Sequence, residues 1–595
     1  MTIKNWVRTG TACAALAGAL SSTAAFAADF SFDDIHYWIG EGTNRAAVVL
    51  DWNNGQPGSS LAWGVRWNGA STNAVAWLRR MDWEDRRLGV SFLSVGSSEV
   101  VQGAGYDADG DGGAFDFTGG SCTDADDWAA SQDGLARWVA VLTNAVHCPS
   151  AVEWPAPAGG LDAVFLDHGD WLGLVHQAQG GAVAAPARPT HAQSPFAFQV
   201  VDFYTNEEEL TFNGMEYANI YPGTVVGRPS SVCPGWEYEG YVFPDVTITP
   251  HSQAFGTNQV FAMASSRAGQ HGFVTIKFDH KVVDDPLNPY GLDFIVFGNA
   301  FLLYGDLEYF DGSDDPANYR DGSGAYDAKP GKVEVSQDGV HWAEYDDGPF
   351  ANTFAPTISH RYEPEAPDAS LFAGNAWWGR LADPTLPVDP SLTPTDFMGR
   401  TIAEYATLFN GSSGGVGFDI DGLDLPVDES TGRKWIQYVR VTSLSSYDDA
   451  MWTVVDAFSD VAPALPYDNW AREHYAWTQL PDKAVSGKEA IAANGKPNFY
   501  NAAFGTAPDA TPVAAFKSTG FAIENGRAVF RVPSAEYAFD AFRIGTASVV
   551  DGLYRDTLPV LEGTAQTPGG FESVFSVPVD PAAAKAFYKI GISAE

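Results

Sequence analysis

The sequence predicts a mainly β, multidomain protein with an α+β N-terminal module, a central jelly-roll-like β-sandwich and a small C-terminal β-domain. The chain has 595 residues, which is too long for one ordinary domain. Its 61 glycines, 36 prolines and 13% aromatic residues favour short strands joined by turns. Segments in which apolar and polar residues alternate recur along the chain, as expected for strands with one buried face.

The first 27 residues are typical of a secretory signal peptide. Lys4 and Arg8 precede a short apolar stretch, and Ala25-Phe26-Ala27 has the small-x-small pattern of a cleavage site. The alternative is a membrane anchor, but the apolar stretch is shorter than the ~20 residues that span a bilayer. We therefore expect no transmembrane segment and a secreted or periplasmic protein, with surface association as a further option.

The charge balance limits the partners. With 75 acidic and 34 basic residues, the net charge is −41. Such a chain repels phosphate backbones and anionic lipid surfaces, which argues against a nucleic-acid or membrane partner. It suits a protein that holds cations or meets an extracellular glycan or small molecule. The sequence does not indicate the oligomeric state.

The N-terminal module, residues 28–178, opens with three aromatic-rich strands. Val48, Leu50 and Trp52 share one face of the second strand, and the third strand alternates Leu61, Trp63, Val65 and Trp67 with small or polar residues. These side chains are expected to build the first core. The predicted elements are strands at 35–39, 45–52 and 61–67, a helix at 73–81, and strands at 90–94 and 99–103.

Residues 179–195 are rich in alanine, proline and glycine, and are interpreted as an interdomain linker. The β-sandwich follows over 196–464, and its near-continuous apolar run at 292–297 predicts a strand buried on both faces. The C-terminal β-domain covers 465–595. The remaining predicted strands are 272–278, 332–336 with a hairpin return at 340–342, 435–442, 451–458, 522–532, 541–544, 571–579 and 587–590.

Several motifs occur in a characteristic order. They are IHYWIGEGTNRAAVVLDW (35–52), SLAWGVRW (60–67), GYDADGDGG (105–113), NPYGLDFIVFGNAF (288–301), KVEVSQDGVHW (332–342), GGVGFDIDGLDL (414–425), YVRVTS (438–443) and VVDAFSDV (454–461). This set resembles bacterial exported cell-surface or PEP-CTERM-type proteins. The resemblance implies the N-terminal module and the sandwich, and carries no activity. The final residues, IGISAE, contain no Pro-Glu-Pro motif. The resemblance therefore does not imply a surface anchor for this chain.

The clearest local motif is Asp107-x-Asp109-x-Asp111-Gly112. Carboxylates at alternate positions before a glycine match the first half of an EF-hand-type calcium loop. Position 118 is threonine where that loop has glutamate. Asp116 is a candidate for the late ligand, and Asp124, Asp126 or Asp127 from the next loop are the alternatives. The alternative is a solvated acidic turn. A possible second metal site is Asp419, Asp421 and Asp424, for which exposed acidic loops are the competing interpretation.

Adjacent Trp377 and Trp378 are candidate ligand-binding residues, because aromatic faces stack on sugars and other flat ligands; core packing is the alternative. Cys122 and Cys148 are expected to form a disulfide if the protein is exported, although Cys233 is an alternative partner for either of them.

No nucleophile elbow, His-Glu-x-x-His motif, phosphate loop or dinucleotide fingerprint occurs. The eleven histidines are scattered, and the densest acid–histidine segment is Asp167-His168-Gly169-Asp170. We therefore expect a calcium-stabilised, non-catalytic binding protein that captures a glycan or small molecule. A secreted polysaccharide hydrolase or lyase, and a structural surface or matrix protein, are the alternatives.

Overall fold

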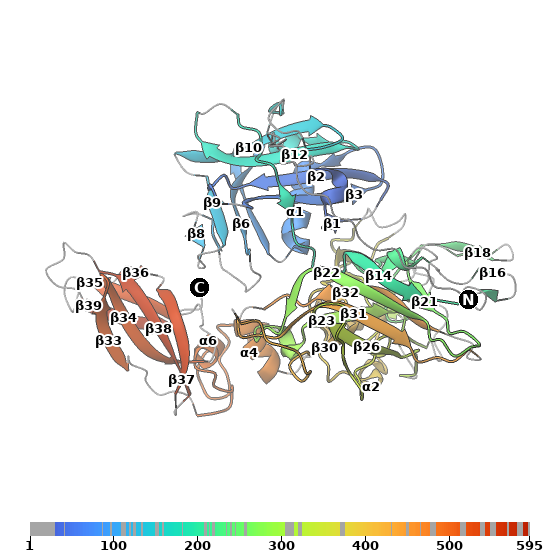
Figure 1. Ribbon diagram of the computed structural model, residues 1–595. Coiled ribbons are helices and arrows are strands. Elements are labelled where there is room, and N and C mark those ends of the chain that lie inside the picture. Colours follow the sequence, from blue (N-terminus) through green and yellow to red (C-terminus); the bar gives the residue numbers. More distant parts are fainter. Residues whose placement is uncertain are drawn as a thin grey trace, which may run out of the picture.

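The protein was analysed as a computed structural model. It is mainly β, with many sheets arranged in multiple domains, as the sequence predicts (Figure 1). The described residues are 30–40, 42–56, 58–85, 87–95, 98–108, 115–117, 121–122, 127–132, 135–148, 154–157, 160–180, 183–206, 211–212, 215–216, 221–233, 235–238, 241–243, 245–254, 259–303, 315–318, 320, 324–368, 375–429, 431–447, 452–464, 466–475, 483–511, 519–535, 542–547, 555–557, 559–567, 570–579 and 587–592.

The N-terminal domain is built on one mixed sheet. Its strand order is β1-β3-β2-β12-β10, and β13 pairs with β3 on the side where β1 also lies. β2 runs antiparallel to β3 and parallel to β12. The strands are β1 (Trp38–Ile39), β2 (Asn44–Asp51), β3 (Ser60–Trp67), β10 (Ala136–Asn144), β12 (Asp170–Ala178) and β13 (Thr190–His191).

Both faces of this sheet are buried, because residues on β2 alternate between two apolar clusters. Val48 and Leu50 face a core that also holds Trp52 and Trp63, whereas Val49 packs with Trp171 on the other side. The predicted core residues are therefore correct. The first face is covered by α1 (Ala74–Glu84) and by the three-stranded sheet β5 (Leu88–Val95), β6 (Ser98–Tyr106) and β9 (Trp128–Ser131).

The central unit is a β-sandwich of two antiparallel sheets. One has the order β14-β22-β31-β26-β27 and the other β21-β32-β23-β30. Valine, isoleucine and phenylalanine side chains from both sheets meet in one buried cluster between them. The strands are β14 (Gln199–Tyr204), β21 (Phe261–Met263), β22 (Phe273–Val283), β23 (Phe294–Gly298), β26 (Gly331–Ser336), β27 (Ala343–Glu344), β30 (Val416–Phe418), β31 (Trp435–Ser443) and β32 (Thr453–Asp460).

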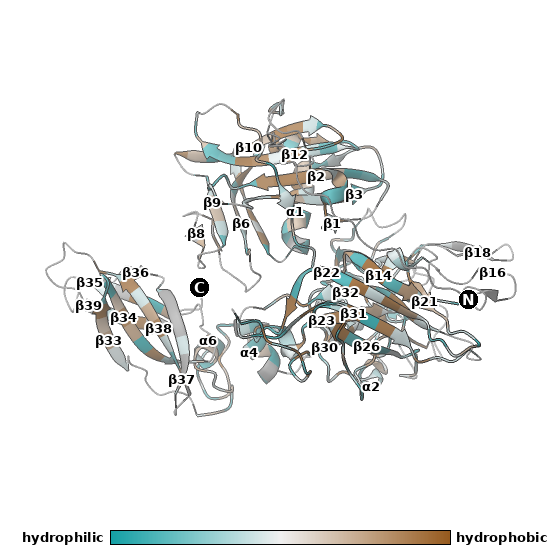
Figure 2. Ribbon diagram, in the orientation of Figure 1, coloured by the Kyte–Doolittle hydropathy of each residue, from teal (hydrophilic) through white to brown (hydrophobic). Residues whose placement is uncertain are grey.

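β23 is buried on both faces, as its continuous apolar run predicts. Phe294 and Val296 face the core of the sandwich, whereas Ile295 and Phe297 belong to a small cluster of their own. A further apolar cluster of the same unit includes residues of α2 (Pro394–Phe397), α3 (Ile402–Phe409) and the hairpin of β28 (His360–Tyr362) and β29 (Trp378–Leu381). Figure 2 shows that hydrophobic stretches lie mainly on the strands.

The C-terminal domain pairs two antiparallel sheets with helices α4 (Pro466–His474) and α6 (Asn498–Ala503). The single strand predicted over 522–532 is instead the hairpin β33 (Gly520–Glu524) and β34 (Arg527–Ser534). Asn525 and Gly526 both have positive φ at its two-residue turn, the usual Asn-Gly hairpin signal. The other elements are α5 (Lys483–Ser486), β35 (Phe542–Ala547), β36 (Arg555–Thr557), β37 (Val560–Thr567), β38 (Gly570–Pro578) and β39 (Phe587–Ile592).

The described part of the segment predicted as a linker packs against the N-terminal domain. His191 pairs with β3 through β13, and the Ala187 N–H donates to Asp51 at 2.6 Å. Arg87 donates to Gln193, and the Ser194 N–H reaches Asp279 of the sandwich at 3.4 Å. These contacts fix the segment between the two domains. Within the described residues, no helix combines the length and apolarity needed to cross a membrane.

Candidate functional site

The candidate site begins at a bulge in β22. Lys277 pairs with Tyr438 of β31, and the next pair is Val282 with Ile436, so residues 278–281 stand opposite residue 437 alone. Extra residues on one strand bend it and re-aim its side chains. Here the bulge directs Asp279 and His280 to the junction between the sandwich and the N-terminal domain.

His280 lies between two carboxylates. Its Nδ1 is 2.7 Å from Asp279 Oδ1, and its Nε2 is 2.8 Å from Asp460 Oδ2 at the end of β32. Burial alone would lower the pKa of His280, but the hydrogen bonds to Asp279 and Asp460 outweigh it and raise that pKa. The imidazolium form, in which both ring nitrogens donate, therefore fits this position best.

Two further histidines approach Asp279 from the side of the N-terminal domain. Asp279 Oδ2 is 3.1 Å from His36 Nδ1 and 3.9 Å from His191 Nε2. The rings of His36 and His191 stack with centroids 3.6 Å apart, and Phe198 stacks on His36 at 4.9 Å. Burial raises the pKa of Asp279, but hydrogen bonds from His280 and His36 more than compensate, so the net pKa is lowered.

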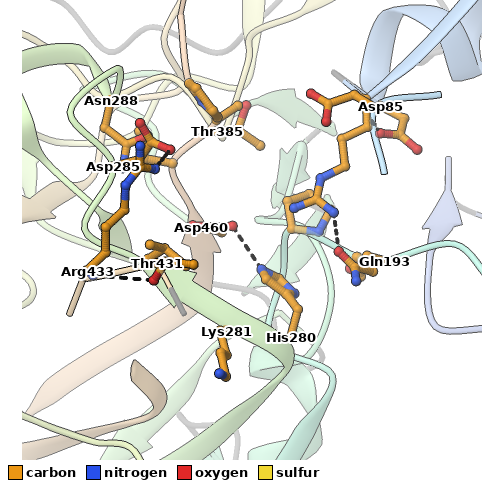
Figure 3. A pocket seen from close by; sticks show the side chains of 18 residues that line it. Asp85, Gln193, His280, Lys281, Asp285, Asn288, Thr385, Thr431, Arg433 and Asp460 are labelled. Atoms are coloured by element: carbon orange, nitrogen blue, oxygen red, sulfur yellow. Dashed lines mark hydrogen bonds and ion pairs between the residues drawn. The ribbon is translucent and has the colours of Figure 1, made fainter. Parts of the chain in front are cut away.

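A cavity of about 210 Å³ opens on the opposite side of His280. Its wall combines side chains of both domains and of the segment between them (Figure 3). Charged groups of both signs converge there, and Asp285 is fixed by Arg433 Nη1 at 2.6 Å. The polar lining residues are Asp85, Arg87, Asp107, Gln193, Ser194, His280, Lys281, Asp285, Asn288, Thr385, Thr431, Arg433 and Asp460.

The end of α1 supplies Asp85 and Arg87 to this cavity. Asp85 Oδ2 accepts from Trp63 Nε1 at 2.7 Å and its Oδ1 accepts from the Arg87 N–H at 3.0 Å. Burial raises the pKa of Asp85 to about 6 in spite of these bonds. The Arg87 side chain donates to Gln193, which ties α1 to the interdomain segment.

The predicted calcium loop is placed only in part. Asp109 and Asp111 lie outside the described residues, and of Asp116 only its place in the short strand β7 (Phe115–Asp116) is described. Asp107 is buried and lines the interdomain cavity, with its N–H bonded to the Arg87 carbonyl at 2.9 Å. Calcium binding by this loop stays a prediction.

The second predicted metal site is not assembled in this structure. Asp419, Asp421 and Asp424 are exposed, and no three acidic ligand atoms of the described chain converge there. Asp419 instead accepts from the Asp421 N–H at 2.7 Å. The Lys434 ammonium donates to the carbonyls of Asp421 and Leu423. The backbone oxygens of this turn thus already have a cationic partner.

Trp378 is fully buried in an apolar cluster, and Trp377 packs against the same cluster. The burial of Trp378 fits the packing alternative, whereas ligand contact by the partly exposed Trp377 stays a prediction. Two adjacent tryptophans do not reveal from sequence alone whether another layer covers them.

The predicted Cys122–Cys148 bridge is not formed in this structure, in which both residues, like Cys233, are thiols. Cys122 donates to the Asp127 carbonyl at 3.3 Å, and Cys148 lies in the cluster around Trp171.

Sequence reasoning missed the Asp279–His280 pair and its partners. In the sequence, His36 lies 243 residues from Asp279, His191 lies 88 residues from it and Asp460 lies 181 residues from it. No local spacing therefore connects these residues. The Asp-His dipeptide inside a strong strand was the only available signal. The denser segment at 167–170 is a turn in which Asp170 accepts from the Asp167 N–H at 2.8 Å, and His168 is exposed.

Comparisons of the chain with protein-family models, with curated proteins and with solved structures give no match.

We predict that Asp85 makes folding pH-dependent. The pKa of about 6 for Asp85 in the folded protein exceeds the ordinary value of 3.8. The contribution of Asp85 to stability is therefore fully present below pH ~4 and is lost as the pH rises through ~6. The melting temperature of wild type minus that of Asp85→Asn should thus be more positive at pH 4 than at pH 7. Calorimetry at both values tests this, and a difference that stays constant would contradict the assignment.

Proposed function

We propose that the protein is an exported binding protein that holds a small polar molecule in the cavity between its N-terminal domain and its sandwich. The observation that carries the proposal is the convergence of charged side chains from both units on one cavity. Pockets at domain interfaces with a few oriented polar groups are the usual place for ligands. Export rests on the signal-like residues 1–27, which lie outside the described chain.

The size and lining of the cavity favour a small charged molecule over a glycan chain. Its ~210 Å³ is below the 300–1,000 Å³ typical of drug-sized ligands, which suits a molecule about as large as an amino acid or a single sugar. The described lining contains no phenylalanine, tyrosine or tryptophan, so it lacks the large aromatic faces on which sugars usually stack. Arg433, which also pairs with Asp285, and Lys281, which also pairs with Asp428, instead suit an anionic group, and Asp107 suits a cationic one.

A hydrolase or lyase is the second candidate, because Asp85 has a raised pKa at a cavity wall, as general acids often do. However, both of its carboxylate oxygens accept hydrogen bonds from its own domain, from Trp63 and from the Arg87 N–H. These bonds fix the turn after α1. Ligand binding without turnover is therefore the better-supported role, and loss of turnover of an identified substrate in Asp85→Asn would favour the enzyme.

Ligand capture is tested by screening charged metabolites and monosaccharides for a rise in melting temperature. We expect a zwitterionic or anionic compound to be selected, with an affinity that Arg433→Gln weakens about tenfold or more, because a charge-assisted bond contributes ~1.5–3 kcal/mol. Arg320→Gln is the matched control, since Arg320 pairs with Glu404 at 3.6 Å outside the cavity. Equal loss in both variants, or selection of neutral oligosaccharides alone, would contradict this proposal.

We also propose that calcium stabilises the first domain through the loop of Asp107, Asp109 and Asp111. Carboxylates that alternate along one short loop repel one another unless a cation joins them. At 100 times its Kd, calcium would raise the free energy of unfolding by ~2.7 kcal/mol, which raises the melting temperature of a domain of this size by roughly 5–10 °C. A calcium-selective chelator should lower the first melting transition of the wild type by that amount and leave Asp109→Ala unaffected. Identical wild-type curves with chelator and with millimolar calcium would refute calcium binding here.

A further inference from the structure

We propose that His36, His191 and Asp279 bind a divalent transition-metal ion, with zinc the best fit, at the junction of the two domains. Their ligand atoms all lie within 4.8 Å of one another, and they form the one such group of three found among the described residues. None of the three lines the cavity, so this site does not depend on the proposed ligand.

The spacing of the three donors suits one ion. Tetrahedral zinc with bonds of about 2.0–2.1 Å places its ligand atoms roughly 3.3 Å apart. Asp279 Oδ2 lies 3.1 Å from His36 Nδ1 and 3.9 Å from His191 Nε2, so both nitrogens face the same carboxylate oxygen at nearly this distance. Small side-chain movements would complete the coordination.

Outer contacts hold the ligands in place. The other oxygen of Asp279 is bound to His280 Nδ1 at 2.7 Å, and the Asp279 side chain is only 2% exposed. Hydrogen bonds from a neighbouring group commonly orient metal ligands in this way. Stacking on His191 and Phe198 fixes the ring of His36. The contact from the Ser194 N–H to Oδ2 is long, at 3.4 Å, and competes weakly with an ion.

The donor set selects the kind of metal. Calcium and magnesium prefer oxygen ligands throughout, whereas two imidazoles and one carboxylate suit zinc and its first-row neighbours. Three protein ligands leave a fourth position for water or a small ligand. His36 and His191 are 24% and 35% exposed at their side chains, so solvent reaches that position.

The ion would also join two domains. His36 precedes β1 and His191 lies in β13 beside the N-terminal sheet, whereas Asp279 belongs to β22 of the sandwich. A metal bound by all three would therefore cross-link the units at the bulge.

The test uses the full-length protein, stripped with EDTA and dialysed into chelator-free buffer. Zinc is titrated by calorimetry, and cobalt(II) by its visible absorption, which reports tetrahedral coordination. We expect one zinc per chain and a tetrahedral cobalt spectrum in the wild type. His191→Gln should lose at least the ~10-fold in affinity that removal of an outer partner alone produces. Its partly exposed side chain makes this variant tolerable for folding, which its melting curve verifies.

His341→Gln is the matched control. His341 Nδ1 faces Asp338 at 2.8 Å on the surface, so this pair has the same donors without the third ligand, and its loss should leave zinc affinity unchanged. Should His191→Gln misfold, His36→Gln provides the same comparison. Zinc affinity that is equal in the wild type and a folded ligand variant, or a cobalt spectrum of octahedral type only, would overturn the proposal. Because calcium does not compete for imidazoles, added calcium should not displace the zinc.

Discussion

The junction between the N-terminal domain and the sandwich depends on a buried row of alternating charges, Asp279–His280–Asp460. Burying a carboxylate is costly unless a hydrogen-bonded cation lies beside it. His280 meets this requirement for two carboxylates at once, at 2.7 and 2.8 Å. Removing the imidazole of His280 would leave both carboxylates without this shared cation. The bulge of β22 is therefore needed, because it places His280 between them.

The two proposed binding features lie at different sides of this row. Asp279 faces the stacked pair of His36 and His191, and Asp460 faces the cavity. The bulge thus gives each side of one short segment a separate chemical environment, with imidazole donors on one and mixed charges on the other. The surplus of acidic residues is compensated locally there by Arg87, Arg433 and Lys281.

More of the fold than of the candidate site could be predicted from the sequence. Alternation along β2 and β3 identified their buried faces, and the apolar run at 292–297 identified a strand covered on both sides, because these patterns are local. The hairpin at Asn525-Gly526 was missed although its turn signal is strong, since the apolar residues on either side read as one strand. Trp378 is buried because other segments of the same unit cover it, and no local sequence pattern encodes such a contact.

The site depends on contacts between distant segments, which explains why single-sequence reasoning found acidic turns instead. Asp107 was selected for a calcium loop and lines the cavity. His36 and Asp460 lie in motifs that carried only a family resemblance, and His191 lies in the segment interpreted as a linker. The bulge of β22, where residues 278–281 stand opposite one residue of β31, brings these groups together and is visible only once the two strands are paired.

Hydrogen–deuterium exchange of the variant His280→Gln tests the central claim most directly. If the charge row fixes the junction, amides at 190–194 and in the bulge at 278–281 should exchange faster than in the wild type, while the paired strands β2 and β12 keep their protection. Unchanged exchange at the junction, or a uniform increase over all three domains, would contradict the account.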